Sequence, residues 1–73
     1  MKATLEFSLP DEQSEFDWAC HAVDMFGVLE ELDRHLRDRL KYDELPEPAR
    51  VELQAIRDAM REDMVERGIA NLI

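Results

Sequence analysis

Residues 25–42 read MFGVLEELDRHLRDRLKY, and this stretch decides the fold. Its apolar residues recur every three or four positions, which is the spacing that lines one face of an α-helix. Four bases fill the last turns, where cations stabilise the C-terminal end of a helix. The pattern therefore predicts a helix over residues 25–42, whose apolar face comprises Met25, Phe26, Leu29, Leu32, Leu36 and Leu40.

A second helical pattern follows the Pro-rich link at residues 45–48. Pro48 suits the first position of a helix, and Gly68 suits the residue that ends one. The pattern predicts a helix over residues 48–67, with an apolar face formed by Ala49, Leu53, Ile56, Ala59, Met60 and Met64. Because the link is short, we expect the two helices to form an antiparallel hairpin.

The N-terminal third combines a strand pattern and a helix pattern. Residues 2–9 alternate between polar and apolar side chains, which is typical of a half-buried β-strand, and Pro10 ends that run. A helix is predicted over about 11–23, with Asp24 capping the next one, and residues 69–73 form a short apolar tail. We therefore expect a single domain, residues 1–73, that is mainly α with one N-terminal β-strand (β-α-α-α), its first helix crossing the hairpin.

A lone strand leaves its own backbone donors and acceptors without partners. The predicted strand therefore has to pair either with the tail of its own chain or with the same strand of a second chain. The short tail favours the second solution, in which Leu5, Phe7 and Leu9 lie in a dimer interface. The sequence thus predicts a homodimer.

Charge is unevenly distributed along the chain, whose net charge is −9. Residues 1–33 hold nine acids and one base, whereas residues 34–73 hold nine acids and eight bases. An acidic surface repels phosphate backbones and attracts basic protein surfaces, so we expect a protein partner and no direct nucleic-acid binding. The alternative is that the charge serves solubility alone.

Composition argues against several other classes. No apolar run approaches the length of a membrane span, and we expect no signal peptide and a cytoplasmic location. Two glycines cannot build a phosphate-binding loop, and Cys20, the only cysteine, lies among acids that disfavour a thiolate. Asp17, Cys20, His21 and Asp24 lack metal-ligand spacing. We therefore expect no enzyme, no cofactor and no metal site.

Two groups of residues are candidate binding sites. Trp18 lies opposite Phe16, off the apolar stripe of the first helix, and tryptophan is enriched in binding hot spots. We expect it to bind a partner together with Asp11, Glu12, Glu15 and Asp17, although it could instead pack under the strand or in a dimer interface. A phosphate or nucleotide is the second candidate ligand, held by Arg34, Arg37, Arg39 and Lys41, whose alternative role is to stabilise the helix end.

Asp33 is a carboxylate inside an apolar stripe. Such a group is costly unless it is paired, and Arg37 lies one helical turn further on. We expect a partly buried ion pair that locks the hairpin, with Arg37 as the partner.

Two resemblances add to this interpretation. Residues 4–12, TLEFSLPDE, resemble the start of ribbon-helix-helix repressors and antitoxins, which implies a dimer with paired strands. Over most of the chain, the sequence resembles small acidic proteins of tailed phages and prophages. The shared features are a Lys-Ala-Thr-Leu strand (residues 2–5), Leu9-Pro10, and a helix with Leu32-Asp33, Leu36-Arg37 and Leu40-Lys41-Tyr42. This resemblance implies a phage setting and carries over no functional residue.

These observations predict a non-enzymatic phage-type accessory protein. It would bind a host protein stoichiometrically through its acidic N-terminal half, as an anti-defence factor or a host-takeover inhibitor does. Two alternatives remain open: a dimeric ribbon-helix-helix-like regulator or antitoxin, and an oligomeric nucleotide-binding sponge.

Overall fold

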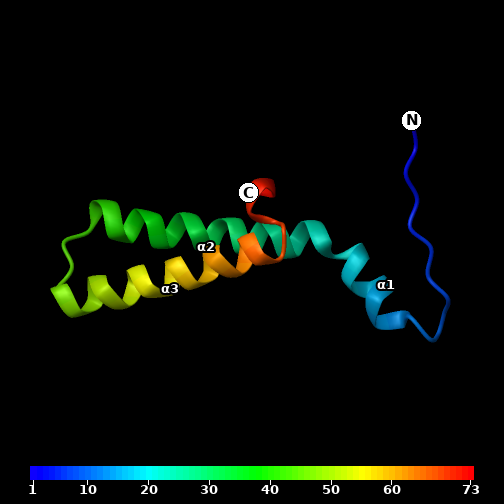
Figure 1. The fold of residues 1–73 in the computed structure, drawn as a ribbon, viewed down its shortest axis with the longest axis horizontal. Coiled ribbons are helices and arrows are strands. Elements are labelled where there is room, and N and C mark those ends of the chain that lie inside the picture. Colours follow the sequence, from blue (N-terminus) through cyan, green and yellow to red (C-terminus); the bar gives the residue numbers. More distant parts are fainter.

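Two long antiparallel helices form the body of the molecule in the computed structural model, which describes residues 1–73 (Figure 1). The elements are α1 (Gln13–Cys20), α2 (Ala22–Tyr42), α3 (Glu47–Glu66) and a 3-10 turn, η1 (Ala70–Leu72). The sequence predicted helices over about 11–23, 25–42 and 48–67. No helix has the length and hydropathy that a membrane span requires.

The break between α1 and α2 lies at His21 instead of Asp24, which the sequence had favoured as a cap. The amide of Met25 donates to the carbonyl of His21 at 3.0 Å, so regular helical bonding continues past Asp24. Gly27 lies inside α2, where a glycine costs about 1 kcal/mol relative to alanine. The packing of α2 along α3 outweighs that cost.

The two ends of α3 follow from proline and glycine. Pro48 occupies the first turn, where its missing amide hydrogen costs nothing. Gly68 adopts a φ of 74°, and the amide of Ile69 then donates to the carbonyl of Met64 at 2.9 Å. This left-handed residue satisfies the last carbonyls of the helix and turns the chain back toward α2.

The hairpin core is a narrow seam between α2 and α3, and only Leu36 and Met64 in it are buried. Successive seam residues are three or four positions apart, as in antiparallel coiled coils. On α2 it consists of Ala22, Phe26, Leu29, Asp33, Leu36 and Leu40, and on α3 of Ala49, Leu53, Arg57, Met60 and Met64. At its closed end, Arg50 donates to the carbonyls of Leu40 at 2.7 Å and Asp43 at 3.3 Å, which satisfies the C-terminal end of α2.

Asp33 forms an ion pair across the seam, which confirms the predicted lock on the hairpin. Its partners differ from the prediction, because Arg57 and Arg61 of α3 pair with it and Arg37 does not. Arg57 Nε lies 3.2 Å from Asp33 Oδ1, and Arg61 Nη1 lies 3.1 Å from Oδ2. Arg37 lies outside the seam and contacts Asp38 instead.

The predicted N-terminal strand is wrong, and the fold is entirely helical. Residues 1–8 form an extended arm without regular secondary structure (Figure 1). Within one chain, the only segment that could pair with this arm is the tail. The tail instead folds into η1 and packs against α3, so residues 2–7 have no backbone hydrogen-bond partner. Because residues 2–9 form no strand, the predicted pairing of this strand with the same strand of a second chain is wrong as well.

The first helix does not cross the hairpin as predicted. It contacts α2 alone and projects beyond the end of the hairpin, with the arm beside it (Figure 1). The molecule is therefore elongated, at 51 × 29 × 20 Å with a Cα radius of gyration of 16.8 Å. A compact domain of this length has a radius of gyration of about 11 Å.

Candidate functional site

The arm (residues 1–8) and α1 form a unit that stands apart from the hairpin (Figure 1). Every residue from Asp11 to Cys20 is exposed. An amphipathic helix normally buries its apolar face against its own chain. Because α1 buries none of its residues, its apolar side chains are available to another molecule.

Two contacts hold the arm beside α1. The Phe7 and Phe16 rings meet edge to face, with 5.9 Å between their centroids. One turn away, the amide of Ser8 donates to Glu12 Oε1 at 2.8 Å, and the amide of Glu12 donates to the carbonyl of Ser8 at 2.7 Å. Leu5 and Leu9, which the sequence assigned to a dimer strand with Phe7, are instead 78% and 53% exposed.

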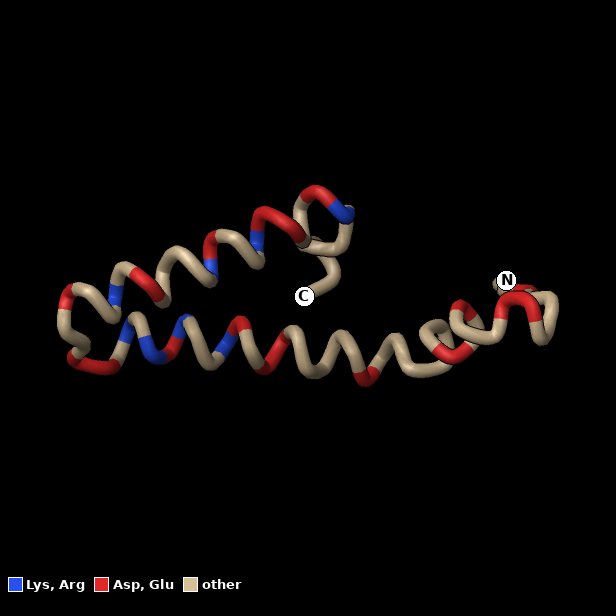
Figure 2. Tube along the Cα trace, turned by 90° about the horizontal axis from the view of Figure 1, so that it is seen from below, with Lys and Arg blue, Asp and Glu red and all other residues tan.

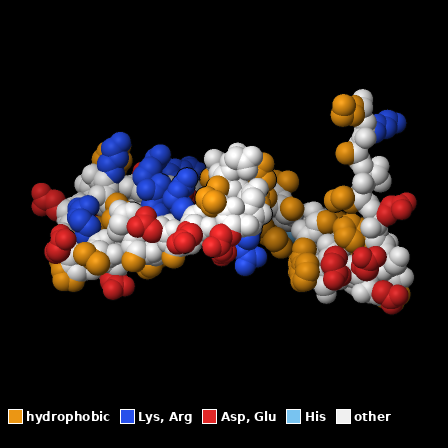
Figure 3. Space-filling model, in the orientation of Figure 1, with side chains coloured by type: hydrophobic (Ala, Val, Ile, Leu, Met, Phe, Trp, Pro, Cys, Tyr) orange, Lys and Arg blue, Asp and Glu red, His pale blue; other side chains and the backbone are white.

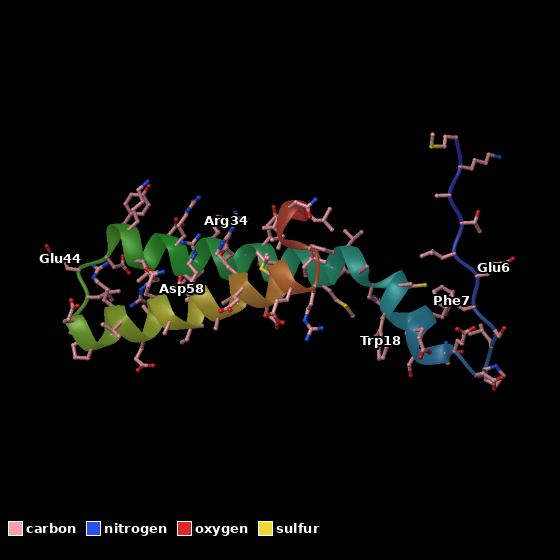
Figure 4. All side chains as sticks on the ribbon, in the orientation of Figure 1. Glu6, Phe7, Trp18, Arg34, Glu44 and Asp58 are labelled. Carbon is pink, nitrogen blue, oxygen red and sulfur yellow. The ribbon has the colours of Figure 1, made fainter.

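Trp18 projects from α1 on the side away from the arm (Figure 4). Trp18 is 59% exposed, because Phe16, which lies nearly opposite on the helix, makes the contact with Phe7. Packing beneath the arm, one of the two alternatives for Trp18, is thereby excluded. An exposed indole offers a large apolar surface with a single hydrogen-bond donor, which suits a protein interface.

The carboxylates predicted for partner binding lie on this same unit. Asp11 and Glu12 occupy the turn before α1, and Glu15 and Asp17 lie within it. Asp17 accepts a hydrogen bond from Gln13 Nε2 at 3.0 Å. No lysine or arginine occurs between residues 3 and 33, so Figure 2 shows α1 with acidic residues as its only charges. Figure 3 shows acidic and apolar side chains side by side over this end of the molecule.

An apolar hollow of about 480 Å³ lies next to the junction between α1 and α2. Its lining begins at Ala22, the first residue of α2, and includes Val23, Phe26 and Leu72. Val23 is 84% exposed. This apolar surface therefore belongs to α2 and η1 and begins two residues after the end of α1.

The four bases proposed to hold a phosphate do not form one site. Arg39 pairs with Asp43 at 2.6 Å, and Lys41 lies over the ring of Tyr42 with 5.2 Å between its Nζ and the ring centroid. Only Arg34 and Arg37 share a hollow, and Arg61 of α3 completes it. Figure 3 shows this group of bases over the middle of the hairpin. The carboxylates of Glu30 and Asp33 line the same hollow, so its charge is largely balanced.

The pKa of Asp33 is shifted by its surroundings. Burial raises the pKa of this group, but the hydrogen bonds from Arg57 and Arg61 outweigh burial and hold the pKa below its ordinary value. The sequence missed both partners. The signal for Arg57 was its spacing, because it falls between Leu53 and Met60 on the apolar stripe of α3.

The residues considered as metal ligands do not converge. His21 Nδ1 lies 3.7 Å from Asp24 Oδ2, and this contact joins two exposed side chains on one turn of α2. No group of three or more His, Cys, Asp and Glu side chains is placed to hold a metal ion.

No family model, curated protein or solved structure matches this chain. The functional argument therefore depends on the geometry and charge of the arm, α1 and the adjoining hollow.

Proposed function

We propose that the protein is a non-enzymatic binding protein that occupies a basic surface on another protein through its arm and α1. The observation that supports this most strongly is that no residue of α1 is buried, although the helix carries Phe16 and Trp18. Isolated helices shorter than about 12 residues are marginal in water. The eight residues of α1 thus gain stability by docking on a partner.

The charge around Trp18 indicates what kind of surface the partner presents. Residues 1–24 carry six acids and one base, and their only ionic contact is the exposed one between His21 and Asp24. A basic surface would gain from these unpaired carboxylates and associate faster through electrostatic steering. Trp18 and the adjoining hollow would supply the apolar centre of the interface, with the carboxylates as its rim.

The resemblance to small acidic proteins of tailed phages supports a setting for this activity. In that setting the partner is a host protein, and its occupation by a stoichiometric binder would block its normal contacts. A nucleic-acid-binding or defence protein of the host has the basic surface that this chemistry requires.

Charge reversal on α1 tests the proposal. The variant Asp11→Lys/Glu15→Lys/Asp17→Lys should lose capture of the partner from host lysate. Its matched control is Glu52→Lys/Glu62→Lys/Glu66→Lys on α3, which changes the net charge equally. The six side chains are exposed, so circular dichroism should show helical content close to that of the wild type in both variants. Equal capture by the two variants would overturn the proposal.

Trp18 provides a second, direct measurement because it is the only tryptophan in the chain. On binding of the captured partner, its fluorescence emission should shift to shorter wavelength as the indole leaves water. Trp18→Ala should weaken binding by about 2 kcal/mol, the scale of an interface hot spot. An emission spectrum that does not change at saturation would place the interface elsewhere.

A further inference from the structure

Four apolar side chains outside the seam form an exposed face on the hairpin, here named the apolar flank: Met25, Val28 and Leu32 on α2, and Ile56 on α3. They are 51%, 69%, 46% and 52% exposed, respectively. The sequence placed three of them, Met25, Leu32 and Ile56, on the faces that α2 and α3 present to each other. The hairpin leaves them in solvent.

The four residues lie on one side of the hairpin. Leu32 precedes the seam residue Asp33 by one position, and Ile56 precedes the seam residue Arg57 by one. Two antiparallel helices are related by an approximate two-fold axis perpendicular to both, so equivalent offsets from the seam lie on the same side. Val28 and Met25 lie four and seven residues before Leu32 and extend the same stripe.

The opposite side of the hairpin is mixed in chemistry. It carries the hollow lined by Arg34, Arg37 and Arg61 (Figure 3). The apolar hollow beside Val23 lies on the same side, since Glu30 lines both hollows. The two sides therefore differ, because these three bases lie on that side, whereas the four residues of the apolar flank are uncharged.

The stripe on α2 is wider than one neighbouring helix can cover. A two-helix seam needs two apolar positions in seven, whereas helices in bundles carry about three in seven. On α2, Val28 precedes Leu32 by four residues and Met25 precedes Val28 by three, so the flank residues repeat the spacing of the seam. This width is typical of a helix that contacts two neighbours, as in a four-helix bundle.

The exposed area of the chain indicates how much surface another molecule would cover. A compact 8.6 kDa monomer exposes about 4,700 Å², whereas this chain exposes 6288 Å². The excess is roughly 1,600 Å², part of which belongs to the arm and α1. Half of it would still equal the roughly 800 Å² that each partner contributes to a stable interface of standard size.

We propose that the apolar flank binds the same flank of a second copy, so that two hairpins close a four-helix bundle. The contact is isologous, because each copy presents the same patch. An antiparallel arrangement places the two acidic N-terminal units at opposite ends, where their mutual repulsion is smallest. This dimer uses helical faces, needs no strand, and does not depend on the partner proposed for α1.

Sedimentation equilibrium of the full chain tests this proposal. The wild type should have twice the monomer mass of 8.6 kDa at micromolar concentration. The variant Leu32→Glu/Ile56→Glu places charges in the interface and should raise the dissociation constant at least ~100-fold. The control Val51→Glu/Val65→Glu should stay dimeric. Its residues are 55% and 66% exposed, and neither belongs to the apolar flank. Val65 follows the seam residue Met64 by one position, and Val51 lines a separate hollow on α3 with Gln54 and Asp58.

A second measurement covers the case in which the Glu variant does not fold alone. The melting temperature of a dimer that folds as it associates rises with protein concentration, so the wild type should show such a rise. A wild type that is monomeric at 100 μM would overturn the proposal. The proposal would also be overturned if Leu32→Glu/Ile56→Glu remained as dimeric as the control Val51→Glu/Val65→Glu. If the wild type is monomeric and Leu32→Glu/Ile56→Glu abolishes capture of the partner, the flank binds that partner and not a second copy.

Discussion

Asp33 shows how one residue can fix the register of a hairpin. Its carboxylate occupies a seam position that would otherwise take leucine, and its side chain is only 14% exposed. Two guanidinium groups from α3 reach it, with Arg57 itself in the seam. If α3 slid by one turn along α2, Asp33 and Arg57 would lose each other as partners while staying partly buried, which is costly.

Removing the carboxylate alone should destabilise the hairpin. We expect Asp33→Leu to lower the free energy of unfolding by about 1.5–3 kcal/mol, because Arg57 would stay in the seam without a partner. The double variant Asp33→Leu/Arg57→Met makes the seam apolar and should recover most of that loss. Urea unfolding followed by circular dichroism measures both values. Asp38→Asn, at a half-exposed pair, is the control and should cost under ~1 kcal/mol.

The same ion pair predicts a dependence of stability on pH. The pKa of Asp33 is lower in the folded chain than its ordinary value of 3.8. The pair therefore stabilises the fold fully above about pH 5, and its contribution falls as the pH drops through the folded pKa. Urea midpoints of the wild type and Asp33→Asn should differ by a constant amount above about pH 5 and converge below it. A difference that grows in acid would contradict this assignment.

At the scale of elements, α1 and α2 differ in what supports them. The 21 residues of α2 pack along α3, whereas the eight residues of α1 end at His21 and contact α2 only at this junction. Helix propensity within α2 therefore affects the stability of the whole hairpin. Changes within α1 should leave the hairpin intact and act on partner binding alone.

The two glycines should respond in opposite ways to alanine. A Cβ at Gly27 meets no atom within 4 Å, so Gly27→Ala should stabilise α2 by about 0.5–1 kcal/mol. Gly68 has a φ of 74°, which strains any other residue, so Gly68→Ala should destabilise the end of α3 by about 1 kcal/mol. Thermal unfolding of both variants checks the two signs. Stabilisation by Gly68→Ala would show that α3 does not end in this left-handed turn.

At the scale of the whole molecule, charge and apolar surface are segregated. The acidic unit of the arm and α1 lies beyond one end of the hairpin, whereas every base except Lys2 lies in residues 34–73, among the acids of the hairpin (Figure 2). The single chain therefore presents two different surfaces, an acidic one around Trp18 and an apolar one on the flank. Different partners suit them, because carboxylates attract a basic surface and an apolar face buries against its like.

The acidic unit should make binding depend on salt. A lysine-rich peptide, used as a basic probe, should bind at 0.01 M salt and shift the emission of Trp18. The affinity of this peptide should fall roughly tenfold or more at 0.15 M salt, where screening is stronger. Dimerisation through the apolar flank should change little over the same range. A peptide affinity that does not respond to salt would contradict a binding surface built from carboxylates.

The sequence by itself determined the two long helices, their short link and the glycine that ends α3. These features depend on local spacing, capping and backbone preference, which act within a few residues. It also located the acidic excess and identified Asp33 as a residue that needs a partner. Alternation alone did not make residues 2–9 a strand, because a strand also needs a neighbour that this chain does not supply.

Only the tertiary structure decided which chemistry each face presents. It gave Asp33 its arginines from α3, separated the four bases of α2, and left α1 and the apolar flank uncovered. Each of these outcomes depends on contacts between residues far apart in sequence, and a helical stripe alone does not say which of its members a neighbouring helix will cover. An apolar stripe on one side of a helix indicates that the helix needs a neighbour. Tertiary packing then decides how much of the stripe the chain itself covers.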